Sequence, residues 1–449
     1  FALYGLPTPK QGSVLGLLGR NGIGKSTAVK ILSGQEKLNL GKVETTNEEI
    51  QSFFKGNEIL RFLTGLETKR ISYKPQNLSD LVTEIKVNDL LNKIGSKEKI
   101  DEIAKTLNVS HILENSLDSL SGGELQRVAI LASTLQDSDI YFFDEPLAFL
   151  DIGERLKVSN YIKKIANEKT VIVVEHDLLI LDYLTDNLNI FYGSQGAYGT
   201  VSGVKSSKSG VNAYLNGFLK EENTRIRDKA LNFNFTKNPP LSGPLIATWP
   251  DFKIKFDSGF ELDTSNGEIH ENHVIGILGK NGTGKTTFVK ALAGLIPTDK
   301  GNLDLNLEIS YKPQYLFTDS EELVKDLIFK EKINNKLKAT FKLGILASKK
   351  LKDLSGGELQ RLNIARSLSK DADIYLIDEP SAYLDVEERI SVAKAIKEII
   401  TEKQKTAFVV DHDLLLVSYL ADSIINFEGI PGKTGSASKI KNFEEGVSH

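Results

Sequence analysis

The chain contains no cysteine, which excludes disulfides, cysteine-ligated zinc or iron–sulfur sites and thiol nucleophiles from its 449 residues. It has no apolar run approaching about 18 residues, so no segment is predicted to cross a membrane. A signal-peptide pattern is also missing, and we therefore expect a cytoplasmic protein. The 56 basic and 60 acidic residues nearly balance, so nucleic acid could be attracted only by local patches.

Internal duplication is the main feature that the sequence does contain. An octapeptide, LSGGELQR, occurs unchanged at residues 120–127 and 354–361. Four further segments recur in the same order: Gly19–Ser26 as Gly279–Thr286, Tyr73–Gln76 as Tyr311–Gln314, Asp144–Pro146 as Asp378–Pro380, and His176–Asp177 as His412–Asp413. A repeat this long, present in two copies, predicts two homologous domains in tandem rather than a solenoid.

The repeats also suggest where the domains end. We expect a first domain at residues 1–186 and a second at 244–428, joined by a Gly/Ser/Asn-rich hinge at 187–243. The boundary is predicted near Pro239–Pro240, and residues 429–449 read as the start of a second connecting segment.

An insertion distinguishes the first half. Lys25 and Gln76 lie 51 residues apart, whereas Lys285 and Gln314 lie 29 apart, so about 22 residues are extra near 48–66. Apolar residues at helical spacing on both sides of Lys55-Gly56-Asn57 predict a helix, a break and a second helix.

Short apolar runs precede each repeated motif. Such runs end at the glycine loops, at the Asp-Glu pairs and before the histidines: residues 14–18, 140–143 and 171–174, and again 274–278, 374–377 and 407–410. Strands that alternate with helices predict an α/β fold with a parallel sheet in each half.

The glycine loops have the GxxxxGKS/T pattern between a strand and a helix. Their amides can surround phosphate oxygens, the lysine can bridge the β- and γ-phosphates, and the hydroxyl can bind Mg²⁺. The predicted ATP-binding residues are Asn21, Gly22, Gly24, Lys25, Ser26, Thr27, Asn281, Gly282, Gly284, Lys285, Thr286 and Thr287. The alternative, a glycine-rich turn with an incidental lysine, is disfavoured by the second copy.

The strand-end acids complete the predicted chemistry. Asp144 and Asp378 can bind Mg²⁺, and Glu145 and Glu379 can accept a proton from an attacking water. Two further pairs could assist: Gln76 and Gln314 could span Mg²⁺ and that water, and His176 and His412 could orient the γ-phosphate and water. Solvated surface positions are the plainer interpretation of these last two pairs.

The repeated octapeptide is predicted to open a helix in each half. Its serine is a typical N-cap, and its exposed amides form an anion site. The residues concerned are Ser121, Gly123, Glu124, Ser355, Gly357 and Glu358. A capping box alone would be purely structural, but both copies precede the acids by the same 23 residues.

Together these motifs resemble those of ABC-type ATPases along nearly the whole chain. The closer resemblance is to the ABC-E subfamily, also called the RNase L inhibitor family, of ribosome-recycling ATPases. The matching segments are residues 19–27, YKPQ in both halves, residues 173–178 and 181–186, the run 216–227, and residues 381–385. One departure is the first D-loop, residues 147–151, which lacks the serine present at Ser381.

The resemblance implies two ATP sites shared between domains that face each other head to tail. Each site would take its loop, Gln, Asp, Glu and His from one half and its signature residues from the other. Adenine would stack on Phe1 in one site and on Phe260 in the other, although either could be a core aromatic. Iron–sulfur clusters are implied only for a cysteine-rich N-terminal domain that this chain does not contain.

The resemblance also implies partners: the small ribosomal subunit with its rRNA, and a release factor or Pelota-type factor. We expect a monomer with intramolecular domain pairing that uses ATP-driven closure to split or recycle ribosomes. The insertion at 48–66 and Arg225 and Arg227 are the predicted ribosome contacts, unless the insertion only enlarges the lobe and the arginines pair with acids of their own hinge. Two other functions stay open: the ATPase subunit of a transporter, and another ABC-type translation factor.

Overall fold

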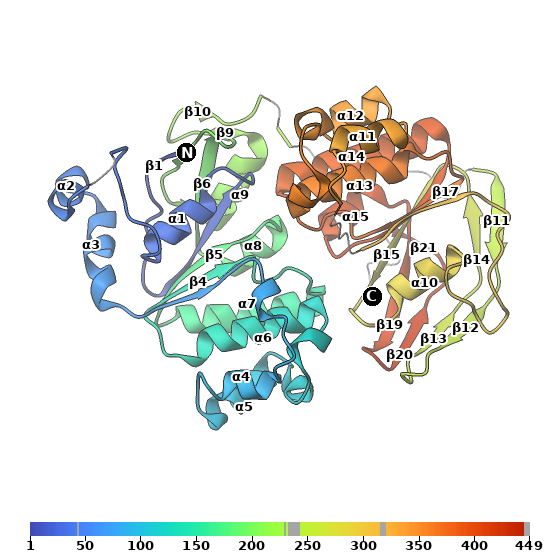
Figure 1. Cartoon of the computed structure of the whole chain (residues 1–449), viewed down its shortest axis with the longest axis horizontal. Helices are drawn as coiled ribbons and strands as arrows, with labels where there is room; N and C mark the ends of the chain where they lie inside the picture. The colour runs from blue at the N-terminus through green and yellow to red at the C-terminus, as the bar shows by residue number, and fades with distance from the viewer. Residues whose placement is uncertain (43–44, 229, 232–242, 315–319, 444–449) are drawn as a thin grey trace. The chain divides into compact units, whose positions relative to one another are not determined.

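The computed structural model describes residues 1–42, 45–228, 230–231, 243–314 and 320–443. The chain divides into two compact units, Phe1–Asn232 and Phe233–His449 (Figure 1). Both are α/β units, so the predicted fold class of two tandem P-loop cassettes is confirmed. Within the described residues, no helix is both long enough and apolar enough to span a membrane. The boundary predicted near Pro239–Pro240 lies outside the described residues.

The first unit is built on one sheet of eight described strands in the order β1-β7-β6-β2-β5-β4-β3, with β8 paired to β6. Its strands are β1 (Ala2–Tyr4), β2 (Ser13–Gly19), β3 (Ile71–Lys74), β4 (Ile140–Asp144), β5 (Thr170–Val174), β6 (Asn187–Ser194), β7 (Tyr198–Val201) and β8 (Lys205–Ser206), with a separate pair β9 (Phe218–Leu219) and β10 (Thr224–Arg225). Its helices are α1 (Lys25–Leu32), α2 (Asn47–Phe53), α3 (Glu58–Gly65), α4 (Val87–Leu91), α5 (Lys97–Thr106), α6 (Gly122–Leu135), α7 (Ile152–Ala166), α8 (Leu178–Leu184) and α9 (Ser207–Asn216).

The centre of this sheet is parallel and covered on both faces. β2 pairs with β5 and β6, β5 with β4 and β4 with β3, all parallel. Tyr141 and Phe143 belong to one buried cluster and Ile140 and Phe142 to another, because successive side chains point to opposite faces. The carboxyl ends of β2, β4 and β5 therefore meet at one edge of the sheet, where ligands of open α/β sheets bind.

The second unit repeats this plan with one sheet of nine described strands in the order β12-β13-β20-β19-β15-β18-β17-β16, with β21 paired to β19, and β11 and β14 form a separate pair. Its strands are β11 (Leu245–Trp249), β12 (Phe252–Lys255), β13 (Glu261–Thr264), β14 (Gly267–His270), β15 (His273–Gly279), β16 (Ile309–Lys312), β17 (Ile374–Asp378), β18 (Thr406–Val410), β19 (Ser423–Ile430), β20 (Thr434–Ala437) and β21 (Lys441–Asn442). Its helices are α10 (Lys285–Leu292), α11 (Val324–Lys330), α12 (Asn335–Thr340), α13 (Gly356–Ser369), α14 (Val386–Lys403) and α15 (Leu414–Leu420).

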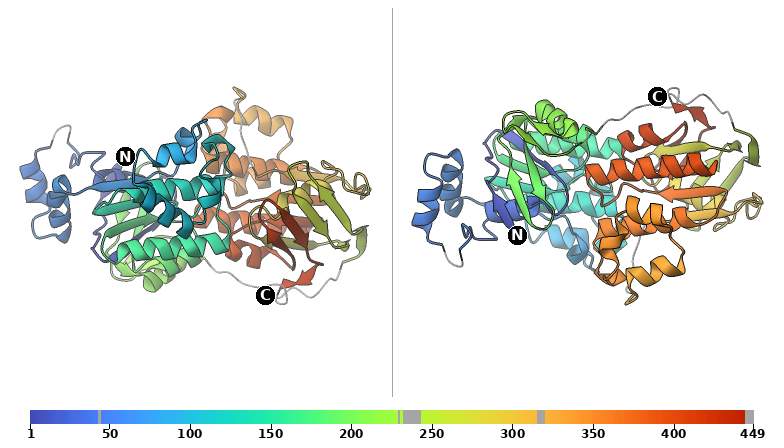
Figure 2. Two further views of the ribbon diagram at one scale, coloured as in Figure 1. Left: turned by 90° about the horizontal axis from the view of Figure 1, so that it is seen from below. Right: turned by 90° about the horizontal axis from the view of Figure 1, so that it is seen from above.

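The first-half insertion forms the two predicted helices, α2 and α3. Thr46 caps α2 through a reciprocal bond with Glu49, and Asn57 caps α3. In Figures 1 and 2 the two helices stand away from the sheet of the first unit. α3 is anchored by the buried Phe62, whereas Phe53 on α2 is 68% exposed. The insertion therefore packs onto the core of the first unit through α3 and exposes an aromatic side chain on α2.

The segment predicted as a hinge is largely part of the first unit. β6 lies inside the sheet beside β2, and β7 and β8 pair with it. Its polar composition suggested a linker, but Asn189 is buried and its amide donates to the Ser202 carbonyl at 2.7 Å. At the corresponding place in the second unit, β19 runs to Ile430 and β20 pairs with it, so residues 429–437 also belong to a sheet.

The two hinge arginines, both predicted as ribosome contacts, differ in their surroundings. Arg225 is exposed at the end of β10, and its Nη1 donates to the Asp228 carbonyl at 3.4 Å. Arg227 lies beyond β10, 5.0 Å above the ring of the buried Tyr214, and its Nη2 donates to the Tyr214 carbonyl at 2.8 Å. Arg227 therefore holds the segment after α9 against that helix.

Candidate functional site

A cavity of about 300 Å³ lies at the carboxyl edge of the first sheet. Most of its lining was predicted from the sequence: Phe1, Asn21, Gly22, Gly24, Lys25, Ser26, Thr27, Gln76, Asp144, Glu145 and His176, with Val174 and Gly196 in addition. The fold thus brings the loop, the strand-end acids, the glutamine and the histidine to one place. Ser121, Gly123 and Glu124 do not line this cavity.

Each glycine loop holds its lysine in the same manner. Gly24 and Gly284 have φ angles of 99° and 96°, which favour glycine, and each precedes a helix. Lys25 Nζ donates to the carbonyls of Gly19 and Arg20 at 2.7 Å, and Lys285 Nζ makes the two equivalent bonds at 2.8 Å. The ammonium is thereby fixed at the helix N-terminus, where it can bind a phosphate.

Phe1 and Phe260 occupy equivalent positions against these loops. A Cβ atom at Gly24 would lie 2.8 Å from the Phe1 ring, and one at Gly284 would lie 3.1 Å from the Phe260 ring. Phe1 is 59% exposed, so its ring is available at the cavity rim. The two rings therefore lie directly against the glycines whose left-handed φ angles shape the loops.

Two glycines from the segments that were predicted as connectors also support the glycine loops. The Gly196 amide donates to the Gly22 carbonyl at 3.1 Å, and the Gly432 amide donates to the Gly282 carbonyl at 3.0 Å. Both glycines precede the short return strands β7 and β20. Sequence reasoning missed them because their segments were assigned to connectors.

The first acids of the pairs, Asp144 and Asp378, are buried at strand ends. Burial and the neighbouring Glu145 raise the pKa of Asp144 to about 6, and burial and Glu379 raise the pKa of Asp378 to about 7. Tyr73 donates its hydroxyl to Asp144 Oδ2 at 3.4 Å, whereas Asp378 Oδ2 accepts from Thr286 Oγ1 at 2.8 Å.

The residues of the second unit fit Mg²⁺. Asp378 Oδ1 is buried and has no hydrogen-bond partner among the described residues. A hard divalent cation takes such carboxylate and hydroxyl oxygens and leaves further positions to water and phosphate. The cation's charge would also favour the ionised form of an acid whose pKa burial has raised.

The second acids, Glu145 and Glu379, are each contacted by the predicted glutamine and histidine. Gln76 Nε2 donates to Glu145 Oε1 and Gln314 Nε2 to Glu379 Oε1, both at 2.7 Å. The histidine Nε2 lies 3.4 Å from the same oxygen in both units, from His176 and from His412.

The carboxyl group of Glu379 stays acidic despite its burial. Burial by itself would raise its pKa, but His412 and Gln314 outweigh that effect, and the pKa lies below its ordinary value. A carboxylate that remains ionised can accept a proton.

One lysine in each unit, at the same position of the repeat, contacts the backbone of the strand-end aspartate. The sequence analysis assigned no role to these two lysines. Lys74 Nζ donates to the Asp144 carbonyl at 2.9 Å, and Lys312 Nζ donates to the Asp378 carbonyl at 2.6 Å. Both lysines are 1% exposed, and burial lowers the pKa of each to about 8. Their recurrence in the YKPQ repeats was the available signal.

The repeated octapeptide begins helices α6 and α13, as predicted. Ser121 and Ser355 are exposed N-caps, and each forms a capping box with the glutamate three residues later. The N-cap serines are exposed within their own units, and a helix N-terminus at such a position can attract an anion.

A comparison with protein families matches residues 8–148 and 262–382 to the family described as ABC transporter. Translation initiation factor RLI1 of Saccharomyces cerevisiae is 41% identical over 463 residues, covering 97% of this chain and 76% of that protein. ABC transporter E family member 1 of Arabidopsis thaliana is 39% identical over 472 residues, covering 100% of this chain and 78% of that protein.

Two solved structures are similar over 99% of the chain. One is the complex of archaeal ribosomal stalk protein aP1 with archaeal ribosome recycling factor aABCE1, with a TM-score of 0.90, 42% identity and 89% coverage of that chain. The other is a model of ribosome-bound archaeal Pelota and ABCE1, with a TM-score of 0.94, 43% identity and 77% coverage.

Proposed function

The chain belongs to the E family of ABC-type ATPases, and from this premise we propose that it binds and hydrolyses ATP at two sites and uses the resulting closure to recycle ribosomes. One observation supports the proposal most strongly. Both units gather a phosphate loop, a buried aspartate and a glutamate contacted by glutamine and histidine at the carboxyl ends of equivalent strands.

Each ATP site is proposed to be composite. Site one uses the first-unit cavity residues together with Ser355, Gly357 and Glu358, and site two uses the second-unit loop and acids together with Ser121, Gly123 and Glu124. The exposed, capped N-termini of α6 and α13 support this pairing, because a helix N-terminus stabilises γ-phosphate charge without an arginine finger.

Within a site, each group has a distinct task. Lys25 or Lys285 binds the β- and γ-phosphate oxygens, while Phe1 or Phe260 stacks on adenine. Glu145 or Glu379 accepts a proton from the attacking water, and the glutamine and histidine fix the carboxylate oxygen that does so. Mg²⁺, held by Ser26 with Asp144 and Gln76 or by Thr286 with Asp378 and Gln314, would neutralise phosphate charge.

Closure provides the link to the ribosome. ATP shifts the two units toward a closed state only by binding that state more tightly, so hydrolysis reverses the shift. The similar structures, one in complex with a ribosomal stalk protein and one bound to the ribosome with Pelota, support the ribosome and a Pelota-type factor as partners. Within the ribosome, we propose the small subunit with its rRNA, and a release factor as the alternative to the Pelota-type factor. Iron–sulfur clusters would lie outside these 449 residues, which contain no cysteine.

The test measures ATP turnover and ribosome splitting together. ATPase activity is measured with and without small ribosomal subunits, and free subunits released from whole ribosomes are measured by sedimentation with a Pelota-type factor present. We expect ATP-dependent splitting, and we expect the Glu145→Gln/Glu379→Gln chain, which can bind ATP and close but cannot hydrolyse it to reopen, to fail in repeated rounds of splitting. If ribosomal particles do not change the rate of ATP turnover and no ribosomes are split, the recycling function is refuted and the ATPase assignment stands.

A further inference from the structure

The backbone of each proposed general base is held in an unusual conformation. Glu145 and Glu379 have φ angles of 45° and 49°, in the left-handed region that residues other than glycine seldom adopt. Their amides donate to the carbonyls of Val174 and Val410 at 2.9 and 2.7 Å, so each peptide is tied to the neighbouring strand. These bonds hold the N–H group of each glutamate, and its carbonyl oxygen accepts from other donors.

The carbonyl side is held by a buried glutamine. Gln126 Nε2 donates to the Glu145 carbonyl at 2.5 Å, and Gln360 Nε2 donates to the Glu379 carbonyl at 2.6 Å. The two glutamines are 1% and 0% exposed. The YKPQ lysines add a longer contact to the same carbonyls, at 3.3 Å from Lys74 and 3.4 Å from Lys312.

The glutamine acts as a donor. Gln360 Oε1 is buried and has no hydrogen-bond partner among the described residues. The polar contact of the side chain amide is therefore the bond that Nε2 donates to the Glu379 carbonyl. A buried amide would be an expensive way to fill space, because an apolar side chain of equal size would leave no unsatisfied oxygen. The same arrangement in both units argues that the donor is needed.

The position of the glutamine joins two parts of the machinery. Gln126 and Gln360 lie on α6 and α13, the helices whose N-caps are the signature serines Ser121 and Ser355. A hydrogen bond from this helix to the backbone of the general base therefore connects the signature motif and the general base of the same unit. Movement of the helix would shift the carboxylate, and a misplacement of about 1 Å can slow catalysis by about 10²-fold.

We propose that Gln126 and Gln360 are positioning residues that hold Glu145 and Glu379 in the left-handed backbone conformation needed for proton abstraction. The inference rests on the proposed function, since it takes these glutamates as the general bases. It assigns a role to the seventh residue of LSGGELQR that is separate from nucleotide contact.

The test isolates the second site. In the Glu145→Gln background, Gln360→Met removes the donor while keeping the length of the side chain, and Asn363→Ala on the same helix is the control. Among the residues that the structure describes, the Asn363 side chain donates only to the Leu359 carbonyl of its own helix, at 3.0 Å. Measured quantities are single-turnover ATP hydrolysis, affinity for a non-hydrolysable fluorescent ATP analogue, and urea unfolding of the second unit by fluorescence of Trp249.

The expected result is a split between chemistry and binding. Gln360→Met should slow hydrolysis by about ten-fold or more while analogue affinity stays within about two-fold, and Asn363→Ala should change neither. Hydrolysis within about two-fold of the background would overturn the proposal, as would parallel losses of hydrolysis and affinity. If Gln360→Met does not fold, Gln126→Met in the Glu379→Gln background gives the same comparison for the first site.

A second variant tests the donor directly. A buried glutamate at position 360 can donate to the carbonyl only while it is protonated, so Gln360→Glu should be active at low pH and lose hydrolysis as pH rises. A pH profile identical to that of the background would also refute the positioning role. Failure of the proposed function is distinguishable, because Glu379→Gln in the same background would then leave hydrolysis unchanged.

Discussion

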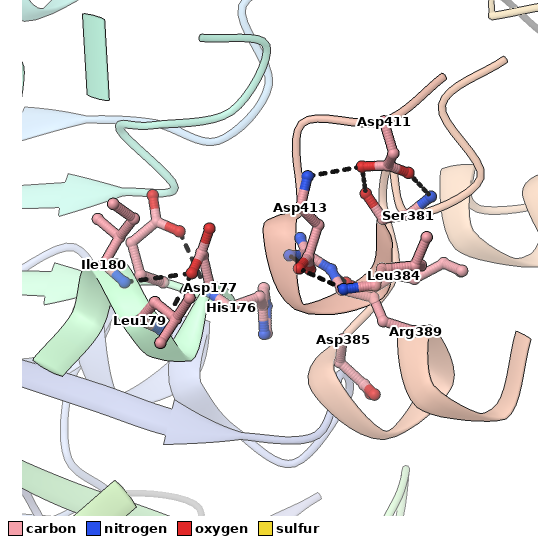
Figure 3. Close-up of polar contacts among 12 residues, drawn as sticks. His176, Asp177, Leu179, Ile180, Ser381, Leu384, Asp385, Arg389, Asp411 and Asp413 are labelled. Atoms are coloured by element: carbon pink, nitrogen blue, oxygen red, sulfur yellow. Dashed lines mark hydrogen bonds and ion pairs between the residues drawn. The ribbon is translucent and has the colours of Figure 1, made fainter. Parts of the chain in front are cut away.

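Ser381 donates two hydrogen bonds to Asp411, from its amide at 2.9 Å and from its hydroxyl at 2.7 Å (Figure 3). The first unit has Leu147 and Glu175 at the equivalent positions, and there the Leu147 amide donates to Glu175 Oε1 at 2.9 Å. The longer glutamate still reaches the D-loop amide, but no hydroxyl is available. The missing D-loop serine is therefore accommodated by a longer acid at the strand end.

The Ser381 hydroxyl is expected to stabilise the second unit. Asp411 is fully buried, and Ser381→Ala leaves its carboxylate with one donor fewer, which should cost about 1–3 kcal/mol of unfolding free energy. Trp249, the single tryptophan of the chain, is buried in the second unit, so its fluorescence during urea unfolding measures this loss. In an Asp411→Asn background the loss should shrink; an equal loss in both backgrounds would show that the bond contributes nothing.

Glu145→Gln and Glu379→Gln should separate ATP binding from hydrolysis. Glutamine keeps the shape of the side chain but cannot accept the water proton, so each change should slow its own site by about 10²-fold or more. Nucleotide affinity by equilibrium titration and phosphate release by a coupled assay give the two quantities. Unchanged turnover in the double variant would remove both glutamates from the role of general base.

The contribution of Asp378 to the stability of the second unit is expected to fall as pH rises from about 4 to about 7. Burial raises the pKa of Asp378 from 3.8 to about 7, so the folded unit takes up a proton that the unfolded chain has lost in this range. Its contribution is fully present below the unfolded pKa and is lost as pH rises through the folded pKa. Asp378→Asn cannot ionise and should flatten this dependence in urea unfolding followed by Trp249 fluorescence.

A control of opposite sign is available in the same unit. The hydrogen bond from Lys405 lowers the pKa of Asp373, so this residue stabilises the unit above its ordinary pKa. Asp373→Asn should therefore reduce stability at neutral pH and leave it unchanged at acidic pH. A dependence of stability on pH between about 4 and 7 that is identical in the wild type and in Asp378→Asn would contradict the assignment for Asp378.

ATP-dependent compaction should require both signature motifs. Arginine at position 355 would place a long side chain at the N-terminus of α13, where the γ-phosphate is proposed to bind, so Ser355→Arg should abolish compaction measured by small-angle scattering. Ser369→Arg, at the other end of α13, is the matched control and should compact normally. Compaction that survives Ser355→Arg would refute the composite sites.

The two hinge arginines should behave differently in ribosome binding. Arg225 is exposed, so Arg225→Ala should weaken small-subunit binding and reduce its salt slope by about one, as for one lost phosphate contact. Arg227 packs on Tyr214, so Arg227→Ala should instead destabilise the first unit. Co-sedimentation across a salt series measures the slope for both variants.

The same series tests the insertion. A chain without residues 48–66 should lose affinity for the small subunit, while Lys99→Ala, an exposed charge loss on α5, should bind normally. Identical curves for Arg225→Ala, the deletion and the wild type would remove the ribosome contacts and leave the ATPase assignment intact.

Local sequence predicted the elements that carry the site. Glycine loops after buried strands, serine caps before helices and acids at strand ends are encoded by neighbouring residues. The strands β2, β4 and β5 and the starts of α1 and α6 were therefore predicted within one or two residues. The duplication helped because each motif could be compared with its copy. The break between α2 and α3 was predictable for the same local reason, since glycine and asparagine interrupt the helical spacing.

The sequence by itself therefore determined that this chain has two ATP-binding α/β units with the full set of catalytic residue types. Only the tertiary structure decided that Asn187–Ser194 is a strand inside the first sheet, and that Arg227 packs on Tyr214. It also decided that Lys312 and Gln360 hold the backbone of the Asp378–Glu379 pair. These contacts join residues far apart in the chain, and they depend on strand order and burial, which residue spacing does not encode.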